Sequence, residues 1–318
     1  MRYNLNMVNK DNGQTNSVNP FLQHKSHIGG FAFSLATLLF ILAGAIISII
    51  IAFAGIEEGT SAYVYLGYLG APIGMIPAMA ITIKYKKTGV KSVFPVKCHP
   101  KYYAIALLLI FGLIFSVSWI DTGVTEIFKL LGYQPKSASD YLPDLSGGLI
   151  VPALIVIAVM PAIFEEGLFR GVILNTCEES LGTIKTVFVV GFAFALFHAS
   201  AEQTVYQFIS GCVFAFLAIR AGAILPSVLM HFINNGLIIV FGACGLLDES
   251  GSAVLPQTVQ IVLIVTSAVC FIGGMIWLIL DKKPLIKSKK GGAAAFFVYA
   301  SVGIVILSIN WIASFFMR

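Results

Sequence analysis

Long apolar stretches alternate with short polar connections along almost the whole chain. A helix needs about 20 predominantly apolar residues to cross the hydrocarbon core of a bilayer. The stretches are continuously apolar and do not alternate in period two, which disfavours a transmembrane β-barrel. The pattern predicts an all-α, polytopic transmembrane helix bundle of about eight or nine spanning helices, at about 29–55, 63–83, 102–120, 148–175, 183–201, 203–220, 223–246, 257–280 and 293–316.

The composition agrees with this class. Of the 318 residues, 58% are hydrophobic and 11% are charged, whereas a soluble domain carries about 25% charged residues. The five cysteines are scattered without a CxxC pair, so we interpret them as small buried side chains and not as a disulfide or zinc framework. The N-terminal residues are polar and give no cleavable signal-peptide pattern.

The charged residues outside the apolar stretches predict an orientation. Lysines gather at 84–101 and 282–290, whereas acidic residues gather at 121–144 and 248–249. The positive-inside rule then puts the lysine clusters and the N-terminus in the cytoplasm. We expect an integral, multi-pass protein of the cell membrane of a prokaryote. The connection after the third span contains the sequence EIFKLLG, whose helical apolar spacing is typical of a short interfacial helix.

Ionisable residues interrupt the fourth apolar span. A charged side chain at the bilayer centre costs about 2.5–3.5 kcal/mol on insertion scales, so such groups usually mark chemistry or transport. Glu166 and Arg170 are four residues apart and can pair on one helix face, while Glu165 points about 100° away. A carboxylate left free in this way can act as a general base. A solvated helix end beyond the membrane would carry the same residues without a function.

Two later spans carry histidines. His198 closes the fifth span, four residues after Phe194. His231 and Asn235 are also four residues apart, in the seventh span, so both side chains point the same way. That spacing suits two donors aimed at one developing oxyanion, two metal ligands, or ordinary hydrogen bonds between membrane helices. Taken singly, neither pair selects a function.

The three motifs together are far more specific. EExxxR, FxxxH and HxxxN follow one another on successive apolar spans, within a region of about 145–245. This arrangement resembles the CAAX-protease and bacteriocin-processing (CPBP, or Abi) family of intramembrane proteases, which is related to the Ras-converting CAAX endopeptidase. The HExxH motif of zinc proteases and the GxGD motif of presenilin-like proteases are absent from the sequence. Ser210-Gly211 lacks the preceding glycine of a rhomboid-type GxSG motif.

The resemblance implies a hydrolytic site. Glu165 is expected to be the general base, and His198 to hold and polarise the attacking water. His231 and Asn235 are expected to donate hydrogen bonds to the tetrahedral oxyanion. The implied substrate is a membrane-embedded or lipid-anchored peptide or protein, including prenylated tails, and no nucleic-acid partner is expected.

The resemblance assigns support to Glu166 and Arg170, with Phe194 as the aromatic residue of the second motif. No cofactor is expected. The alternative is a catalytic zinc ion bound by Glu165, His198 and His231, a donor set that zinc accepts.

The expected organisation is a polar cytoplasmic segment at 1–28, N-terminal transmembrane helices at 29–145, a CPBP-like catalytic core at 146–246 and C-terminal helices at 247–318. The predicted boundaries place His198 farther from the cytoplasm than Glu165, a conflict for a shared site. Either the fifth span starts well inside the cytoplasm, or the boundaries are shifted, for example because the fourth span runs on to about 177–179. Two other functions remain open. One is a non-proteolytic membrane scaffold or bacteriocin-immunity protein with the same fold, and the other is a proton- or cation-coupled transporter.

Overall fold

The computed structural model describes residues 20–86, 89–135, 141–248, 253–281 and 283–316. Residues 1–19 of the predicted N-terminal segment lie outside this part, as do 87–88, 136–140, 249 and 282 of the predicted charged connections. Within the described residues the regular structure is helical, apart from one isolated β-bridge between Leu247 and Ala253. The all-α helix bundle predicted from the sequence is confirmed.

Eight helical stretches of the described chain are long and apolar enough to cross a membrane, as predicted. A further apolar helix, α9 (Thr183–Phe197), is shorter. Of two short helices, η1 (Pro20–Gln23) precedes the first long helix, and α3 (Val90–Val93) follows the second. The long stretches are α1 (Ser26–Ala54), α2 (Ser61–Lys86), Lys101–Leu130, Gly147–Leu181, α10 (Thr204–Ala221), α11 (Leu225–Ala243), α12 (Gln257–Ile279) and α13 (Gly292–Phe316).

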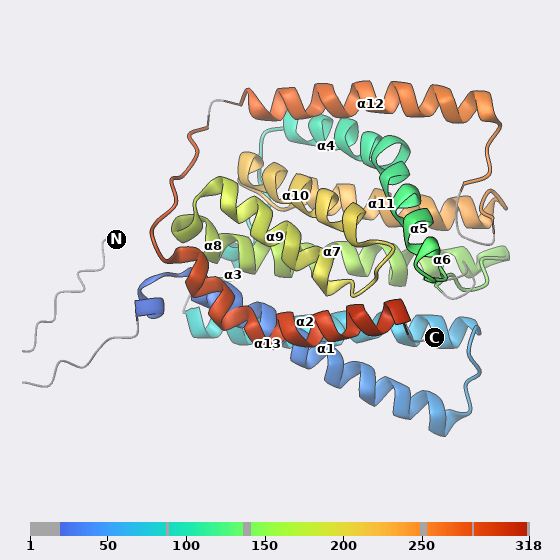
Figure 1. Cartoon of the computed structure of the whole chain (residues 1–318), viewed down its shortest axis with the longest axis horizontal. Coiled ribbons are helices and arrows are strands. Elements are labelled where there is room, and N and C mark those ends of the chain that lie inside the picture. Colours follow the sequence, from blue (N-terminus) through green and yellow to red (C-terminus); the bar gives the residue numbers. More distant parts are fainter. Residues whose placement is uncertain (1–19, 87–88, 136–140, 249–252, 282, 317–318) are drawn as a thin grey trace, which may run out of the picture.

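The third stretch is longer than predicted. It consists of α4 (Lys101–Gly112), the π-helical η2 (Leu113–Val117) and α5 (Ser118–Leu130). The apolar part of EIFKLLG is therefore helical, but it belongs to α5, which continues the third stretch, and does not form a separate helix. Figure 1 shows α5 continuing obliquely from the end of α4, and α5 packs against α10.

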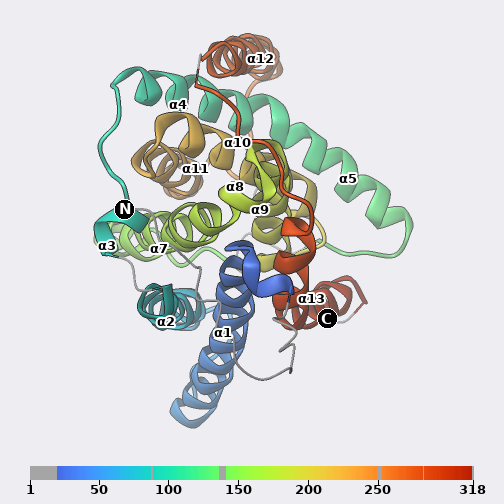
Figure 2. The same ribbon diagram turned by 90° about the vertical axis from the view of Figure 1, so that its left-hand side faces the viewer.

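The fourth stretch passes through the middle of the bundle. It consists of η4 (Gly147–Leu149), α6 (Ile150–Ala153), the π-helical η5 (Leu154–Val159), α7 (Met160–Glu166), the π-helical η6 (Gly167–Ile173) and α8 (Leu174–Leu181). Figure 2 shows α7 between α2 on one side and α11 on the other. Single π-helical turns inside α-helices frequently occur at functional sites, and here two of them flank the Glu165-Glu166 pair.

The turn at Gly182 explains how His198 and Glu165 come to lie at the same level in the bundle, in contrast to the predicted boundaries. Gly182 joins α8 to α9 with a φ of 75° and an extended ψ, so the chain reverses there. Glu165 lies 17 residues before Gly182 and His198 lies 16 residues after it. At 1.5 Å per residue, both lie roughly 25 Å along antiparallel helices from the same turn. The fourth span runs on to Leu181, beyond the predicted end at 175, and this extension brings the two residues level.

Two glycines bring α9 and α10 into close contact. A Cβ built on Gly211 would lie 3.0 Å from the Gly191 Cα, and a Cβ on Gly191 would lie 2.4 Å from the Cys212 Sγ. Side chains at these positions would force the helices apart. Small residues at crossings of this kind are how membrane helices approach closely. The crossing also places the backbone carbonyl of Gly211 beside the buried centre of the bundle.

Many of the described lysines lie at one end of the bundle, which we call the lysine-rich end. Lys25 and Lys289 both pair with Glu179 at the end of α8. Lys101 Nζ lies 2.8 Å from Asp281 Oδ2, and the Tyr102 hydroxyl donates to the same oxygen at 2.6 Å. The two contacts of Asp281 tie the connection after α12 to the first turn of α4.

Candidate active site

Glu165, His198 and His231 converge although they come from three different helices. The Nε2 atoms of His198 and His231 each lie 3.9 Å from Glu165 Oε2. This oxygen is buried, and it has no hydrogen-bond partner in the described part of the chain. The Glu165 and His198 side chains keep 13% and 20% exposure, so the centre is largely but not completely buried.

Hydrogen bonds fix which nitrogen of each ring faces Glu165. His198 Nδ1 lies 2.9 Å from the Phe194 carbonyl oxygen, which can only accept. His231 Nδ1 lies 2.9 Å from Glu166 Oε1, and a carboxylate also accepts. Each Nδ1 therefore carries a hydrogen, and in its neutral form each imidazole presents the lone pair of Nε2 to Glu165.

The spacing of the three atoms suits a small bridging molecule. Two atoms 3.9 Å apart are too distant for a direct hydrogen bond. A water oxygen about 2.8 Å from both would subtend an angle of about 90°, which hydrogen-bond geometry tolerates. The cluster can therefore hold a water beside a carboxylate that is able to accept its proton.

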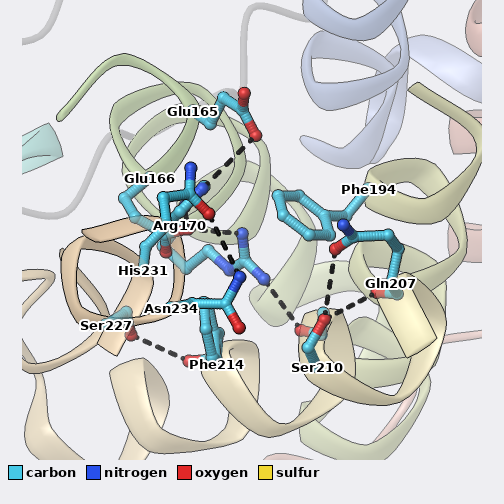
Figure 3. Close-up of polar contacts among 12 residues, drawn as sticks. Glu165, Glu166, Arg170, Phe194, Gln207, Ser210, Phe214, Ser227, His231 and Asn234 are labelled. Carbon is cyan, nitrogen blue, oxygen red and sulfur yellow. Dashed lines mark hydrogen bonds and ion pairs between the residues drawn. The ribbon is translucent and has the colours of Figure 1, made fainter. Parts of the chain in front are cut away.

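A buried ionic group lies directly behind this centre. Glu166 and Arg170 are both 0% exposed, and Arg170 Nη1 lies 2.9 Å from Glu166 Oε1, as their spacing predicts. Arg170 Nη2 also donates to the Gly211 carbonyl oxygen at 3.0 Å. Because Glu166 Oε1 accepts from both Arg170 and His231, it joins the helix α7 to α11. Figure 3 shows this group beside Glu165.

Aromatic rings enclose the guanidinium. The Arg170 Cζ lies 4.4 Å from the centre of the Phe194 ring and 5.2 Å from that of Phe214. Phe194 also contacts the imidazole of His198, with 4.7 Å between ring centres. Cations are attracted to aromatic faces, and more strongly where water is excluded. Phe194 therefore touches both the ionic group and the proposed water-binding histidine.

Asn235 is close to His231 along α11 but makes separate contacts. Its Nδ2 donates to the Ile157 carbonyl oxygen at 3.0 Å, and its Oδ1 accepts from Asn234 Nδ2 at 3.1 Å. The Tyr206 hydroxyl in turn donates to Asn234 Oδ1 at 2.6 Å. The structure thus brings Glu165, His198 and His231 together, whereas the contacts of Asn235 are to Asn234 and the Ile157 carbonyl.

Residues 147–237 match the family model described as Rce1-like, type II CAAX prenyl endopeptidase. The chain has an Rce1-like core. The match contains every residue of the three motifs, and the family is one of peptide hydrolases, so the resemblance to the CAAX-protease family predicted from the sequence is confirmed over residues 147–237. A search of the curated proteins and a search of the solved structures each found no significant match.

The zinc alternative can be compared with the geometry of the Rce1-like core. Among the described residues, no group of three or more His, Cys, Asp or Glu side chains is arranged to hold a metal ion. Glu165, His198 and His231 are of the right chemical types to bind zinc. The Nε2 atom of each histidine, however, is 3.9 Å from Glu165 Oε2. Atoms bound about 2 Å from one tetrahedral zinc lie about 3.3 Å apart, so this arrangement fits water better.

Several residues of the Rce1-like core could not be assigned from the sequence. Gly211 contributes through its carbonyl group, which no side-chain motif reveals. Phe214 and Tyr206 are two of many aromatic residues in apolar helices. Asn234 occupies a variable position of the HxxxN motif, and its polar side chain inside an apolar span was the only feature of the sequence that could have indicated a role.

Proposed function

We propose that the chain is an intramembrane endopeptidase that hydrolyses a peptide bond of a membrane-embedded or lipid-anchored substrate. In this proposal Glu165 and His198 activate the attacking water. The observation that carries it is the buried Glu165 Oε2, which has no hydrogen-bond partner within the described part of the chain and lies 3.9 Å from two imidazole nitrogens. A peptidase needs a base, a water site and nearby donors, and electrostatic contacts among them are strengthened where water is otherwise excluded.

The charges of the site support a division of roles. Glu165 and Glu166 carry two negative charges when ionised, and Arg170 carries one positive charge. One further proton neutralises the cluster, which lowers the cost of burying it. In this proposal His231 carries that proton, because its Nδ1–H already donates a hydrogen bond to Glu166. As an imidazolium it would also present an N–H at Nε2, which the neutral form lacks.

The proposed reaction follows from these roles. Glu165 takes a proton from the water while the oxygen attacks the peptide carbonyl carbon, and His198 Nε2 accepts the second water hydrogen in a hydrogen bond. The carbonyl oxygen becomes an oxyanion, which the Nε2–H of His231 and an amide N–H of Asn235 stabilise. Glu165 then returns the proton to the departing amine, so the cleavage consumes one water and leaves the site unchanged.

The family description supports the prenylated C-terminal tail as a substrate class, because it names a CAAX prenyl endopeptidase. The test is cleavage, in proteoliposomes, of a quenched fluorescent peptide that ends in a farnesylated CAAX sequence. Wild-type protein is expected to cleave this probe, and Glu165→Ala is expected to be inactive although it inserts and folds. Equal cleavage by both proteins would refute the role of Glu165. Cleavage by neither would contradict the substrate class.

A further inference from the structure

A line of side-chain amides leads from Tyr206 to the proposed oxyanion donor. Tyr206 lies in the first turn of α10, and Asn234 and Asn235 are consecutive residues of α11. The Tyr206 hydroxyl, the Asn234 amide, the Asn235 amide and the Ile157 carbonyl are linked by bonds of 2.6, 3.1 and 3.0 Å. Sequence motifs include only Asn235 of these residues.

The Ile157 carbonyl, at one end of this line of hydrogen bonds, determines which group donates and which accepts in each bond. The Ile157 carbonyl can only accept, so Asn235 must turn Nδ2 toward it. Asn235 Oδ1 then faces Asn234, which must present Nδ2 in turn. This leaves Asn234 Oδ1 facing the Tyr206 hydroxyl, which must donate. Reversing either amide would set oxygen against oxygen, so the line has a single favourable arrangement.

We propose that Tyr206 and Asn234 are positioning residues that hold the Asn235 amide with Nδ2 ready for the oxyanion. Nδ2 carries two hydrogens, and the bond to Ile157 uses one of them. The other is left for a ligand. Asn235 and His231 are four residues apart on α11 and face the same way. The inference rests on the proposed function, because an oxyanion forms only if the site hydrolyses its substrate.

The Tyr206 bond also ties two helices together. It joins α10, which carries the Gly211 carbonyl that Arg170 contacts, to α11, which carries His231 and Asn235. An amide held from both of its ends loses little freedom when the transition state forms, and such preorganisation is the main source of oxyanion stabilisation. Removing the hydroxyl leaves Asn234 Oδ1 without its donor and loosens the amide next to it.

The test compares Tyr206→Phe with a matched variant elsewhere. Tyr102→Phe is the control, because the Tyr102 hydroxyl also donates a 2.6 Å bond to a side chain, Asp281, at the lysine-rich end. With the farnesylated probe in proteoliposomes, Tyr206→Phe is expected to lower kcat by about 2–10-fold with KM unchanged, the range for one hydrogen bond. Tyr102→Phe is expected to leave both constants within error of the wild type.

A double-mutant cycle separates positioning from general damage. If Tyr206 acts through the amide, Tyr206→Phe should have almost no further effect on kcat in an Asn235→Ala background. Asn234→Ala should behave in the same way. Multiplying effects of Tyr206→Phe and Asn235→Ala, or a Tyr206→Phe protein that matches the Tyr102→Phe control, would overturn the inference.

The two proposals fail in different ways. If the wild type cleaves the probe and Glu165→Ala does not, but the cycle shows no coupling, then the positioning inference alone is wrong. If Glu165→Ala cleaves the probe as well as the wild type, the proposed role of Glu165 is contradicted. If the wild type does not cleave it, the prenylated-tail substrate class is contradicted. In either case the positioning role in cleavage of this substrate is contradicted as well.

Discussion

Replacing one of the two adjacent glutamates by glutamine should lower the stability of the protein, whereas replacing the other should lower its activity and leave its stability almost unchanged. Glu166 is 0% exposed, and its Oε1 accepts from both Arg170 and His231 at 2.9 Å. Glu166→Gln keeps the shape but leaves the buried guanidinium without its counter-charge. Removing one partner of a buried ion pair costs about 3–5 kcal/mol. We therefore expect Glu166→Gln to lower the free energy of unfolding by about this amount.

Glu165→Gln is the matched control. The Glu165 Oε2 atom has no hydrogen-bond partner among the described residues, and the two histidine nitrogens beside it are 3.9 Å away, so a neutral side chain there removes a buried charge and breaks no direct hydrogen bond. We expect stability within about 1 kcal/mol of the wild type, or above it. Activity should nevertheless fall by a factor of about 10²–10⁴, the usual contribution of a general base.

The assay can use a cysteine of the protein itself. Cys177 is fully buried in α8, so a thiol-reactive fluorophore reports the temperature at which it becomes accessible in detergent. Cys244 is exposed and can be replaced by serine in all the proteins to lower the background. Glu166→Gln should become reactive several degrees below the wild type, and Glu165→Gln should not. Equal unfolding temperatures for the two variants would refute the assignment of the buried pair to Glu166.

Three further outcomes are expected. Arg170→Lys should lose about 1–3 kcal/mol of stability in the same assay, because an ammonium group cannot reach Glu166 and the Gly211 carbonyl together; a wild-type unfolding temperature would contradict this. Burial alone would raise the pKa of Asp281, but hydrogen bonds, chiefly from Lys101 and Tyr102, lower it from 3.8 to about 2. The ionised form of Asp281 is then favoured in the folded protein, so the stabilisation it gives is present above pH 3.8 and is lost as the pH falls through about 2. At pH 6 the free energy of unfolding of Asp281→Asn should be about 1.5 kcal/mol below that of the wild type. This difference should disappear toward pH 2, and a difference that stays constant with pH would be inconsistent with this pKa. Cleavage of the probe should survive a zinc chelator, and loss with recovery on added zinc would show that the metal alternative is correct.

The hydrophobic pattern was sufficient for the class of fold and for most of the helices. A transmembrane helix must satisfy its backbone internally and present apolar side chains, so its sequence reports its presence directly. The pattern was less informative about where helices end. The apolar pattern stops near residue 175, because residues 176–181 (TCEESL) are mostly polar, yet the helix continues to Leu181, and the level of His198 depends on that continuation.

The three motifs located the candidate site, but its contacts depend on packing. The pairing of Glu166 with Arg170 follows from helical spacing and is present in the structure. The bond from His231 to Glu166 joins residues 65 positions apart, and no local pattern encodes it. The same is true of Tyr206, whose partner is fixed by how α10 packs on α11. The catalytic roles of Glu165, His198, His231 and Asn235 stay predictions.

We propose above that this membrane protein cleaves peptides through Glu165. The most direct measurement compares, by quantitative proteomics, membranes of cells that contain the wild type with membranes that contain Glu165→Ala at equal abundance. We expect at least one membrane-bound or lipid-anchored protein to accumulate uncleaved with Glu165→Ala, while its shortened form appears with the wild type. Identical sets of termini in the two membranes would contradict it and would favour a non-proteolytic scaffold.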